Sequence, residues 1–286
     1  MKEANLDSSI SMEHFMRRRL ERVKEYCSYM PKDNVLDDLF TNDQFSNVDL
    51  PLVVDEKNKL IYCEMPKVGS TNWKRVFMKL TNPAYANVPV SEISGGRKYD
   101  ENGLKKLTDF PAAQRKEMLD TYFKFTMVRN PFERLLSGYR DKGWNGFFPD
   151  KEIREGPERE YRLGANSTKI ADFDTQDKLG FNAFLDDLIL KGPEIGVGGH
   201  FGVRTRHWTR YNDICHFCAV NYQMIAKVEN VDDEADFILA RAGKLIFSSL
   251  FRPYWPIDSF RLKKTCSENF TITIWARIVF KHLTRI

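Results

Sequence analysis

The segment Pro66–Arg75 (PKVGSTNWKR) combines the residue types that bind a phosphate-like anion. Gly69 allows the backbone to approach a ligand closely, and Lys67 adds a mobile positive charge. Ser70 and Thr71 add hydroxyl groups. The segment is not a Walker A loop, because GxxxxGK[ST] is absent and the lysine precedes the glycine. An ordinary strand-to-helix turn, with Ser and Thr capping the helix, is the alternative interpretation.

A second basic segment, Val128–Lys142 (VRNPFERLLSGYRDK), has the residues for another anion site. Arg129 follows an apolar run and can direct two N–H groups at one phosphate. Ser137 lies two helical turns further on and can add a hydroxyl group. Two anion sites at consecutive strand ends indicate a ligand with two separate phosphate-like groups.

A third basic segment could bind an extended acidic ligand. Arg204, Arg206 and Arg210 surround His207 at mostly alternate positions, which suits one face of an extended segment. Arginines of this kind bind carboxylate and sulfate groups. A solvated basic loop is the alternative.

The cysteines favour disulfides over a metal site. The chain has five: Cys27, Cys63, Cys215, Cys218 and Cys266. Cys215 and Cys218 form a CxxC, but without a second such pair a zinc site would need scattered ligands. We expect a local or long-range disulfide formed in an oxidising compartment. Possible N-glycosylation sites at Asn166 and Asn269 agree with a lumenal address.

Strand and helix patterns alternate around these motifs. Strands are predicted at Leu60–Cys63, Tyr122–Val128 and Met224–Val228. Helices are predicted at Asn72–Leu80, at Phe132–Arg140 after Pro131, at Lys116–Thr121, at Phe181–Leu190 and at Asp232–Lys244. This order predicts an α/β fold with a mainly parallel sheet covered on both faces. The stretches 81–103 and 141–180 and the glycine run 196–199 are predicted to be loops.

The first part of the chain has a different character. Apolar residues of Ser11–Met30 fall on one helical face, with arginines largely opposite. We expect an outer helix with a solvated face, and contact with a membrane or an acidic partner is the alternative. The first ten residues do not form a signal peptide, and no apolar run is long enough to span a bilayer.

Charge is distributed unevenly. The 286 residues include 44 Lys and Arg and 40 Asp and Glu, a net charge of +4 that is too mild to indicate a nucleic-acid partner. Segments 64–79, 123–142 and 204–210 alone hold 12 basic and 3 acidic residues, a net charge of +9. We therefore expect a basic channel in an otherwise acidic protein.

These motifs together resemble one enzyme family. PKVGSTNWKR resembles the 5′-phosphosulfate loop of sulfotransferases, and VRNPFERLLSGYRDK resembles their 3′-phosphate motif. Both are most similar to the Golgi carbohydrate sulfotransferases, of the chondroitin/dermatan 4-O-sulfotransferase and HNK-1 sulfotransferase type. A third segment, from His207-Trp208 through the CxxC to Glu229, agrees. The resemblance runs in order from about Leu60 to about Lys244.

The resemblance implies a single sulfotransferase domain at 51–286, with a P-loop-like parallel sheet flanked by helices, after an N-terminal basic helix and linker at 1–50. The implied donor is 3′-phosphoadenosine 5′-phosphosulfate (PAPS), and no metal is required. Its 5′-phosphosulfate would be held by Lys67 and the turn Val68, Gly69, Ser70, Thr71, Asn72 and Trp73. Its 3′-phosphate would be held by Arg129 and Ser137.

The same resemblance implies an acidic glycan acceptor, either a glycosaminoglycan or an N-glycan terminus, and a Golgi location. Family members are usually membrane-anchored, and no anchor is visible in this chain. Lys67 is expected to stabilise the leaving oxygen and His207 to act as the base, with Glu229 as the competing base. A catalytically inactive relative that binds acidic glycans and a P-loop nucleotide kinase are the alternative functions.

Overall fold

The computed structural model describes residues 2–42, 50–94, 103–143, 185 and 205–241. The chain forms two compact units, of which the first comprises Met1–Arg129 with Arg210–Pro256 and the second Asn130–Thr209 with Ile257–Ile286. Each unit is described by itself. The predicted loops at 141–180 and 196–199, the predicted helix at 181–190, Arg204 and the possible glycosylation sites lie outside the described residues, apart from 141–143 and Leu185.

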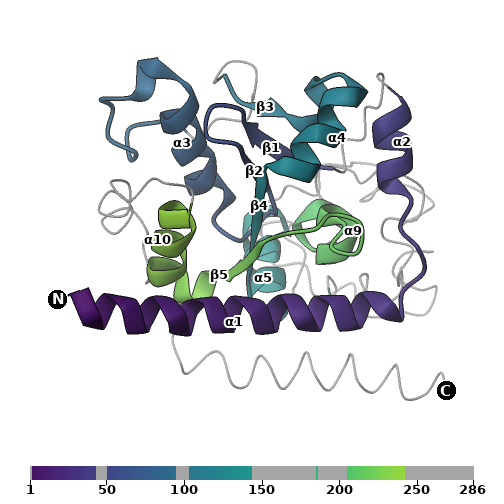
Figure 1. Ribbon diagram of the computed structural model, residues 1–286, viewed down its shortest axis with the longest axis horizontal. Coiled ribbons are helices and arrows are strands. Elements are labelled where there is room, and N and C mark those ends of the chain that lie inside the picture. The colour runs from purple at the N-terminus through teal and green to yellow at the C-terminus, as the bar shows by residue number, and fades with distance from the viewer. Residues whose placement is uncertain (1, 43–49, 95–102, 144–184, 186–204, 242–286) are drawn as a thin grey trace, which may run out of the picture. The chain divides into compact units, whose positions relative to one another are not determined.

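A five-stranded sheet forms the centre of the first unit, with the order β3-β1-β2-β4-β5 (Figure 1). Its strands are β1 Leu52–Asp55, β2 Leu60–Cys63, β3 Lys105–Lys106, β4 Phe123–Val128 and β5 Met224–Lys227. β2, β4 and β5 are parallel, whereas β1 pairs antiparallel with β2 and β3 pairs antiparallel with β1. The predicted α/β fold and its three parallel strands are therefore confirmed. The two unpredicted antiparallel strands make the sheet mixed.

The parallel strands form because their side chains are buried on both faces of the sheet. Every residue of β2 is buried, as are the middle four residues of β4. On one face, Tyr62, Trp73 and Phe125 form an aromatic cluster with ring centroids 4.8–5.8 Å apart. This cluster fixes helix α3 against β2 and β4, so it positions the turn between β2 and α3.

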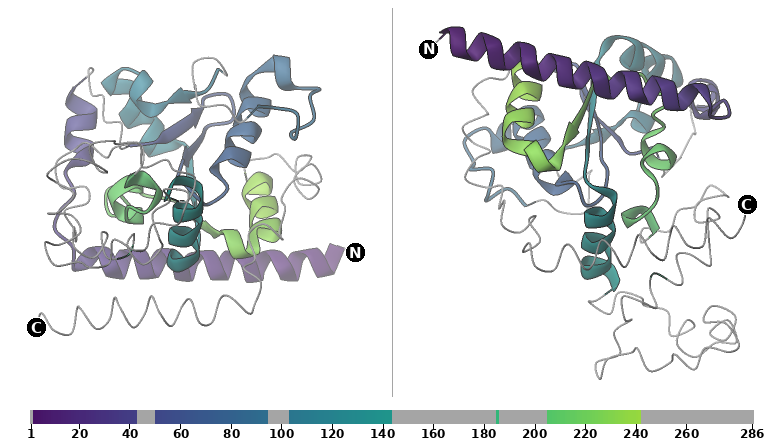
Figure 2. Two further views of the ribbon diagram at one scale, coloured as in Figure 1. Left: turned by 180° about the vertical axis from the view of Figure 1, so that it is seen from behind. Right: turned by 90° about the horizontal axis from the view of Figure 1, so that it is seen from below.

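Helices cover both faces of the sheet, as predicted (Figures 1 and 2). On one face lie α3 Ser70–Thr81 and α10 Val231–Arg241, and on the other lie α2 Val35–Thr41, α4 Ala112–Thr121 and α9 Tyr211–Cys215. The predicted N-terminal helix is confirmed as α1 Lys2–Ser28, which packs against β5 and α10. None of the described helices combines the length and the apolar character that crossing a membrane requires.

A buried arginine joins α2 to α4. Arg115 is fully buried and donates hydrogen bonds to four backbone carbonyls. Those of Leu39 and Asn42 are at 3.0 Å and 2.7 Å, at the end of α2. A buried cation is stable only when its N–H groups are satisfied in this way. This pairing explains why α2 forms although its seven residues give little signal in the sequence.

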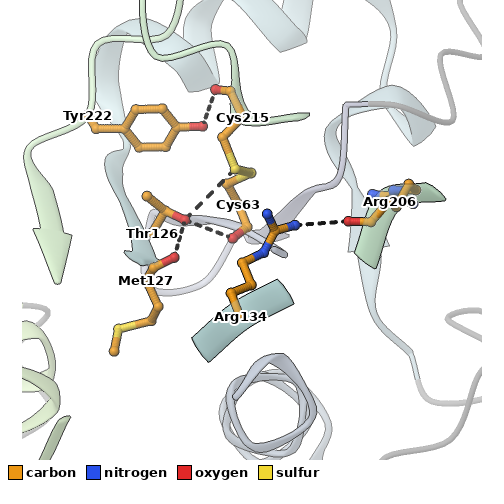
Figure 3. Close-up of a disulfide and its surroundings, with 7 residues drawn as sticks. All are labelled: Cys63, Thr126, Met127, Arg134, Arg206, Cys215 and Tyr222. Atoms are coloured by element: carbon orange, nitrogen blue, oxygen red, sulfur yellow. Dashed lines mark hydrogen bonds between the residues drawn. A yellow bond between two sulfur atoms is a disulfide. The ribbon is translucent and has the colours of Figure 1, made fainter. Parts of the chain in front are cut away.

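Two long-range disulfides cross-link the first unit. Cys27 is bonded to Cys218 and Cys63 to Cys215, over sequence separations of 191 and 152 residues. The CxxC cysteines therefore bond to different distant partners, and their sulfur atoms are not available to zinc. The first disulfide joins the last turn of α1 to the core. The second joins the end of β2 to the end of α9, next to Thr126 (Figure 3).

We expect a non-reducing peptide map to show Cys27 linked to Cys218 and Cys63 linked to Cys215. Chymotrypsin cleaves after aromatic residues, and Phe217 lies between the two CxxC cysteines. The digest of acid-denatured, alkylated protein therefore separates the two links, which mass spectrometry then identifies. A Cys215–Cys218 link, or free thiols at these positions, would contradict the structure.

Candidate functional site

The turn between β2 and α3 has a strained backbone. Lys67 and Gly69 both adopt left-handed conformations, with φ of 70° and 83°. Glycine adopts this conformation at little cost, whereas it costs a lysine about 1–2 kcal/mol. Such strain concentrates where a ligand is bound, because the surrounding structure must maintain it. The predicted anion-binding turn is thus the one place in the described chain where two left-handed residues lie two positions apart.

The start of α3 presents free backbone donors. Gly69 is the N-cap and provides no side-chain acceptor. Its carbonyl accepts from the N–H groups of Asn72 and Trp73 at 3.0 Å and 3.3 Å. The N–H groups of Ser70 and Thr71 have no acceptor among the described residues. No acidic residue occupies the first turn of this 12-residue helix, so its N-terminal dipole is not neutralised there.

Three of the predicted donor-binding residues have side chains that already have structural roles. Val68 and Trp73 are fully buried, so only their backbone atoms can contact a ligand. The Asn72 side chain accepts a hydrogen bond from Arg75 at 3.1 Å. The side chains open to a ligand in this turn are those of Lys67, which is half-buried, and of Ser70 and Thr71.

Arg129 contacts this turn directly. It follows β4, is 6% exposed, and its Nη1 donates to the carbonyl oxygen of Lys67 at 3.5 Å. The Tyr211 hydroxyl fixes its backbone by accepting from the Arg129 N–H at 2.9 Å and donating to the Arg129 carbonyl at 2.8 Å. The structure therefore brings Arg129, the first cation of the second predicted motif, to the Lys67 turn of the first. No local pattern pointed to Tyr211, which is 82 residues from Arg129 in the sequence.

The helix after Arg129 belongs to the second unit. α5 Pro131–Gly138 begins as predicted, because the Asn130 side chain accepts from the N–H groups of Phe132 and Glu133. It ends two residues earlier than predicted, and a π-helical turn, Tyr139–Gly143, follows. Ser137 lies in the last turn of α5 and is half-buried.

Arg134 positions His207 within the second unit. The buried Arg134 guanidinium donates to the carbonyls of Thr209 at 2.6 Å and Arg206 at 2.9 Å, and Figure 3 shows the second contact. A Cβ atom on Gly138 would lie 3.1 Å from the His207 carbonyl oxygen, so any larger residue would require one of the two segments to shift by a few tenths of an ångström. His207, at the end of the 3-10 helix Thr205–His207, is therefore held against α5. No residue pattern pointed to Arg134 or Gly138 as positioning residues, although both lie in the second basic segment.

The net charge of +9 in the three basic segments overstates the number of cations that a ligand can contact. Lys124 is buried and donates to two carbonyls at 2.6 Å and 2.8 Å, and this burial lowers its pKa. Lys79 donates to three carbonyls, and Lys74 pairs with Glu64 at 2.9 Å. Arg75 donates to the Ile93 carbonyl at 2.8 Å and to Asn72. With Arg134, at least five of the twelve basic residues expected in a channel are thus bound within the protein.

The remaining predicted residues differ in their surroundings. Arg206 is half-buried, whereas Arg210 is largely exposed and pairs with Asp213 at 2.7 Å. Glu229, the competing base, is exposed in the 3-10 helix Val228–Asn230 directly after β5. His216 pairs with Asp33 at 2.8 Å. Across the residues that the structure describes, no three His, Cys, Asp or Glu side chains gather closely enough to hold a metal ion.

Comparisons with known proteins give a consistent result. Residues 50–255 match the model of the sulfotransferase family. Human carbohydrate sulfotransferase 10 is 32% identical over 241 residues, and the Gallus gallus protein of the same name is 33% identical over 229 residues. Carbohydrate sulfotransferase 11 of Rattus norvegicus is 32% identical over 235 residues. No solved structure matches this chain.

The alignments cover most of this chain but less of the relatives. They include 83%, 79% and 82% of this chain and 64%, 60% and 63% of the three relatives, respectively. The chain therefore spans less than two thirds of the length of these curated relatives.

We expect Tyr211→Phe to lower the free energy of unfolding by about 1–2 kcal/mol, because it leaves the Arg129 N–H and carbonyl without their shared partner. Urea denaturation measures this change. Tyr26→Phe is the matched control, because Tyr26 is 48% exposed and its hydroxyl has no hydrogen bond in the described part of the chain. Equal stability of the two variants would contradict a role for Tyr211 in fixing Arg129.

Proposed function

This chain belongs to the sulfotransferase family, and we propose that it transfers a sulfonyl group from PAPS to a hydroxyl group of an acidic, chondroitin-like glycan. The names of its relatives support a carbohydrate acceptor. The single observation that carries the proposal is the contact between Arg129 and the Lys67 carbonyl, because it places the arginine proposed for one anion beside the turn proposed for the other, within one unit. A donor with two phosphate groups needs such a pair of sites.

The donor site would use backbone and side-chain groups together. The free N–H groups of Ser70 and Thr71, at the start of α3, suit the 5′-phosphosulfate. The guanidinium of Arg129 suits the 3′-phosphate, to which Ser137 would add its hydroxyl group. PAPS supplies the sulfonyl group and leaves as 3′-phosphoadenosine 5′-phosphate (3′,5′-ADP).

The reaction requires charge stabilisation and removal of one proton. The bond between sulfur and the phosphate oxygen breaks, and a bond from sulfur to the acceptor oxygen forms. Lys67, beside the donor turn, would stabilise the negative charge on the leaving oxygen. His207 would accept the proton of the acceptor hydroxyl, with Glu229 as the competing base. A sulfonyl group carries less negative charge than a phosphoryl group, so this chemistry has less need of a metal.

The acceptor would be recognised by its negative charge. Arg204, Arg206 and Arg210 would bind carboxylates or sulfates of the glycan chain. Because such glycans are made in the secretory pathway, we place the protein in the Golgi, where association with the membrane would follow the family pattern. The two disulfides agree with an oxidising compartment.

We expect 3′,5′-ADP to raise the melting temperature of the protein by several degrees, and ATP with Mg²⁺ to leave it unchanged, because only the first carries a 3′-phosphate. Thermal-shift measurements test this. Arg129→Lys should lose the shift, since lysine lacks the forked guanidinium. Arg140→Lys, an exposed position in the same motif, should keep it.

The opposite pattern would identify the other functions. Stabilisation by ATP with Mg²⁺ alone would indicate a nucleotide kinase. Indifference to both nucleotides would indicate a relative that only binds glycans. Either result would contradict the proposed donor site.

We expect Lys67→Gly to lower kcat by at least about 10²-fold while the protein stays folded. Glycine suits the left-handed backbone at this position, so strain cannot account for the loss.

His207→Ala should lower the rate by about 10²–10⁴-fold and remove the acidic limb of the pH–rate profile, because a base must be unprotonated to act.

Lys57→Ala, in the exposed turn between β1 and β2, is the matched control and should keep full activity. Retained turnover in Lys67→Gly would contradict the role of the lysine. An unchanged rate and acidic limb in His207→Ala would transfer the role of base to Glu229.

A further inference from the structure

A basic cavity lies beside α1, and the proposed reaction does not use it. Its volume is about 570 Å³, and residues of α1, of α10 and of the end of β5 line it. All of these elements belong to the first unit. The lining includes six residues that are important here: Met12, Phe15, Arg18, Arg22, Lys227 and Asp233.

A buried ion pair forms one wall of the cavity. Arg19 of α1 donates to both carboxylate oxygens of Glu234 on α10, at 2.6 Å and 2.8 Å. Glu234 is 1% exposed and also accepts from the N–H of Lys227 at 2.7 Å and from the Asn230 side chain. Removing one partner of such a pair would leave a buried charge, so the pair holds α1 firmly against α10 and β5.

The other cations of the cavity are not neutralised. Within the described residues, Arg18, Arg22 and the ammonium group of Lys227 make no hydrogen bond or ion pair. Asp233 is the one carboxylate of the lining that Arg19 does not neutralise. The cavity therefore has an excess of positive charge, which attracts a ligand with several anionic groups.

Apolar surface lies next to these cations. Phe15 is 51% exposed and is one of three large apolar side chains that are exposed in the described part of the chain. Met12 is half-buried in the same lining. A pyranose ring presents C–H groups on one face and can pack on an aromatic ring, while its carboxylate or sulfate binds an arginine. The combination suits an acidic sugar.

The cavity adjoins the strand ends that form the candidate site. Lys227 is paired with Val128 in the sheet register, and Arg129 follows Val128 directly. Neighbouring strands lie about 4.8 Å apart, so the strand end that lines the cavity is next to the strand end that carries Arg129.

We infer that this cavity binds a further stretch of the acidic glycan chain whose hydroxyl group is sulfonated; the inference rests on the proposed function. A membrane surface fits less well, because a helix that enters a bilayer needs a free apolar face. Met16 of α1 is 3% exposed, and Cys27 is bonded to Cys218, so that face is already packed on the protein. A concave site with three cations suits a chain of repeated carboxylates better.

Direct binding without donor tests the inference. The probe is a fluorescently labelled chondroitin octasaccharide, with a neutral maltooctaose of equal length as the ligand control. Arg18→Ala/Arg22→Ala should raise the Kd of the acidic probe about tenfold, the effect of losing two exposed charge contacts. Arg17→Ala/Lys24→Ala removes the same charge from exposed positions of α1 outside the lining, and should keep the wild-type Kd. Neither variant should bind maltooctaose.

Three results would overturn the inference. The first is an equal loss of affinity for the acidic probe in both double variants, and the second is an unchanged Kd for this probe in Arg18→Ala/Arg22→Ala. The third is that Arg18→Ala/Arg22→Ala loses binding only to vesicles that contain phosphatidylserine. The 3′,5′-ADP thermal shift of the same wild-type preparation separates this failure from failure of the proposed function. A normal shift with an unchanged Kd refutes the cavity alone. An absent thermal shift, together with a rise in Kd only in Arg18→Ala/Arg22→Ala, refutes the donor site and leaves the cavity as a glycan-binding site.

Discussion

The parallel pairing of β2 with β4 holds the candidate site together. It places Cys63 opposite Thr126, so the two strands end side by side and deliver the Lys67 turn and Arg129 to the same edge of the sheet. The disulfide from Cys63 to Cys215 then fixes β2 to α9, whose first residue, Tyr211, holds the backbone of Arg129. Each of these contacts would be lost if the register shifted by one residue, because every side chain would then change faces.

Positive charge has two different uses in this chain. Arg115, Lys124 and Arg134 are buried, and each donates hydrogen bonds to backbone carbonyls. Those of Arg115 and Arg134 join elements distant in sequence, whereas Lys124 donates to carbonyls within five residues of itself. Arg18 and Arg22 of α1 are instead exposed and remain accessible to anions. A cation is costly to bury unless its N–H groups are satisfied, so the buried ones are structural by necessity. Net charge alone could not separate the two groups.

The sequence predicted the elements whose signal is local. Strands β2, β4 and β5 are apolar runs, and α5 has a proline and an asparagine cap at its start. The two residues of β3 are both lysines and give no strand pattern, whereas β1 was missed although it is as long and as buried as β2. In the candidate site, the turn at Lys67 and Arg129 could be located from their motifs. The disulfide partners, Tyr211 and the role of Arg134 depend on contacts across 70 residues or more, which no local pattern records.

The central claim is that this chain transfers a sulfonyl group to an acidic glycan, and one assay tests it most directly. The purified chain is incubated with PAPS labelled with radioactive sulfur and a panel of desulfated glycosaminoglycans, and the label in the polysaccharide fraction is measured. We expect label in chondroitin that depends on active protein and is suppressed by excess 3′,5′-ADP. A folded protein that binds 3′,5′-ADP yet labels none of the glycans would contradict it.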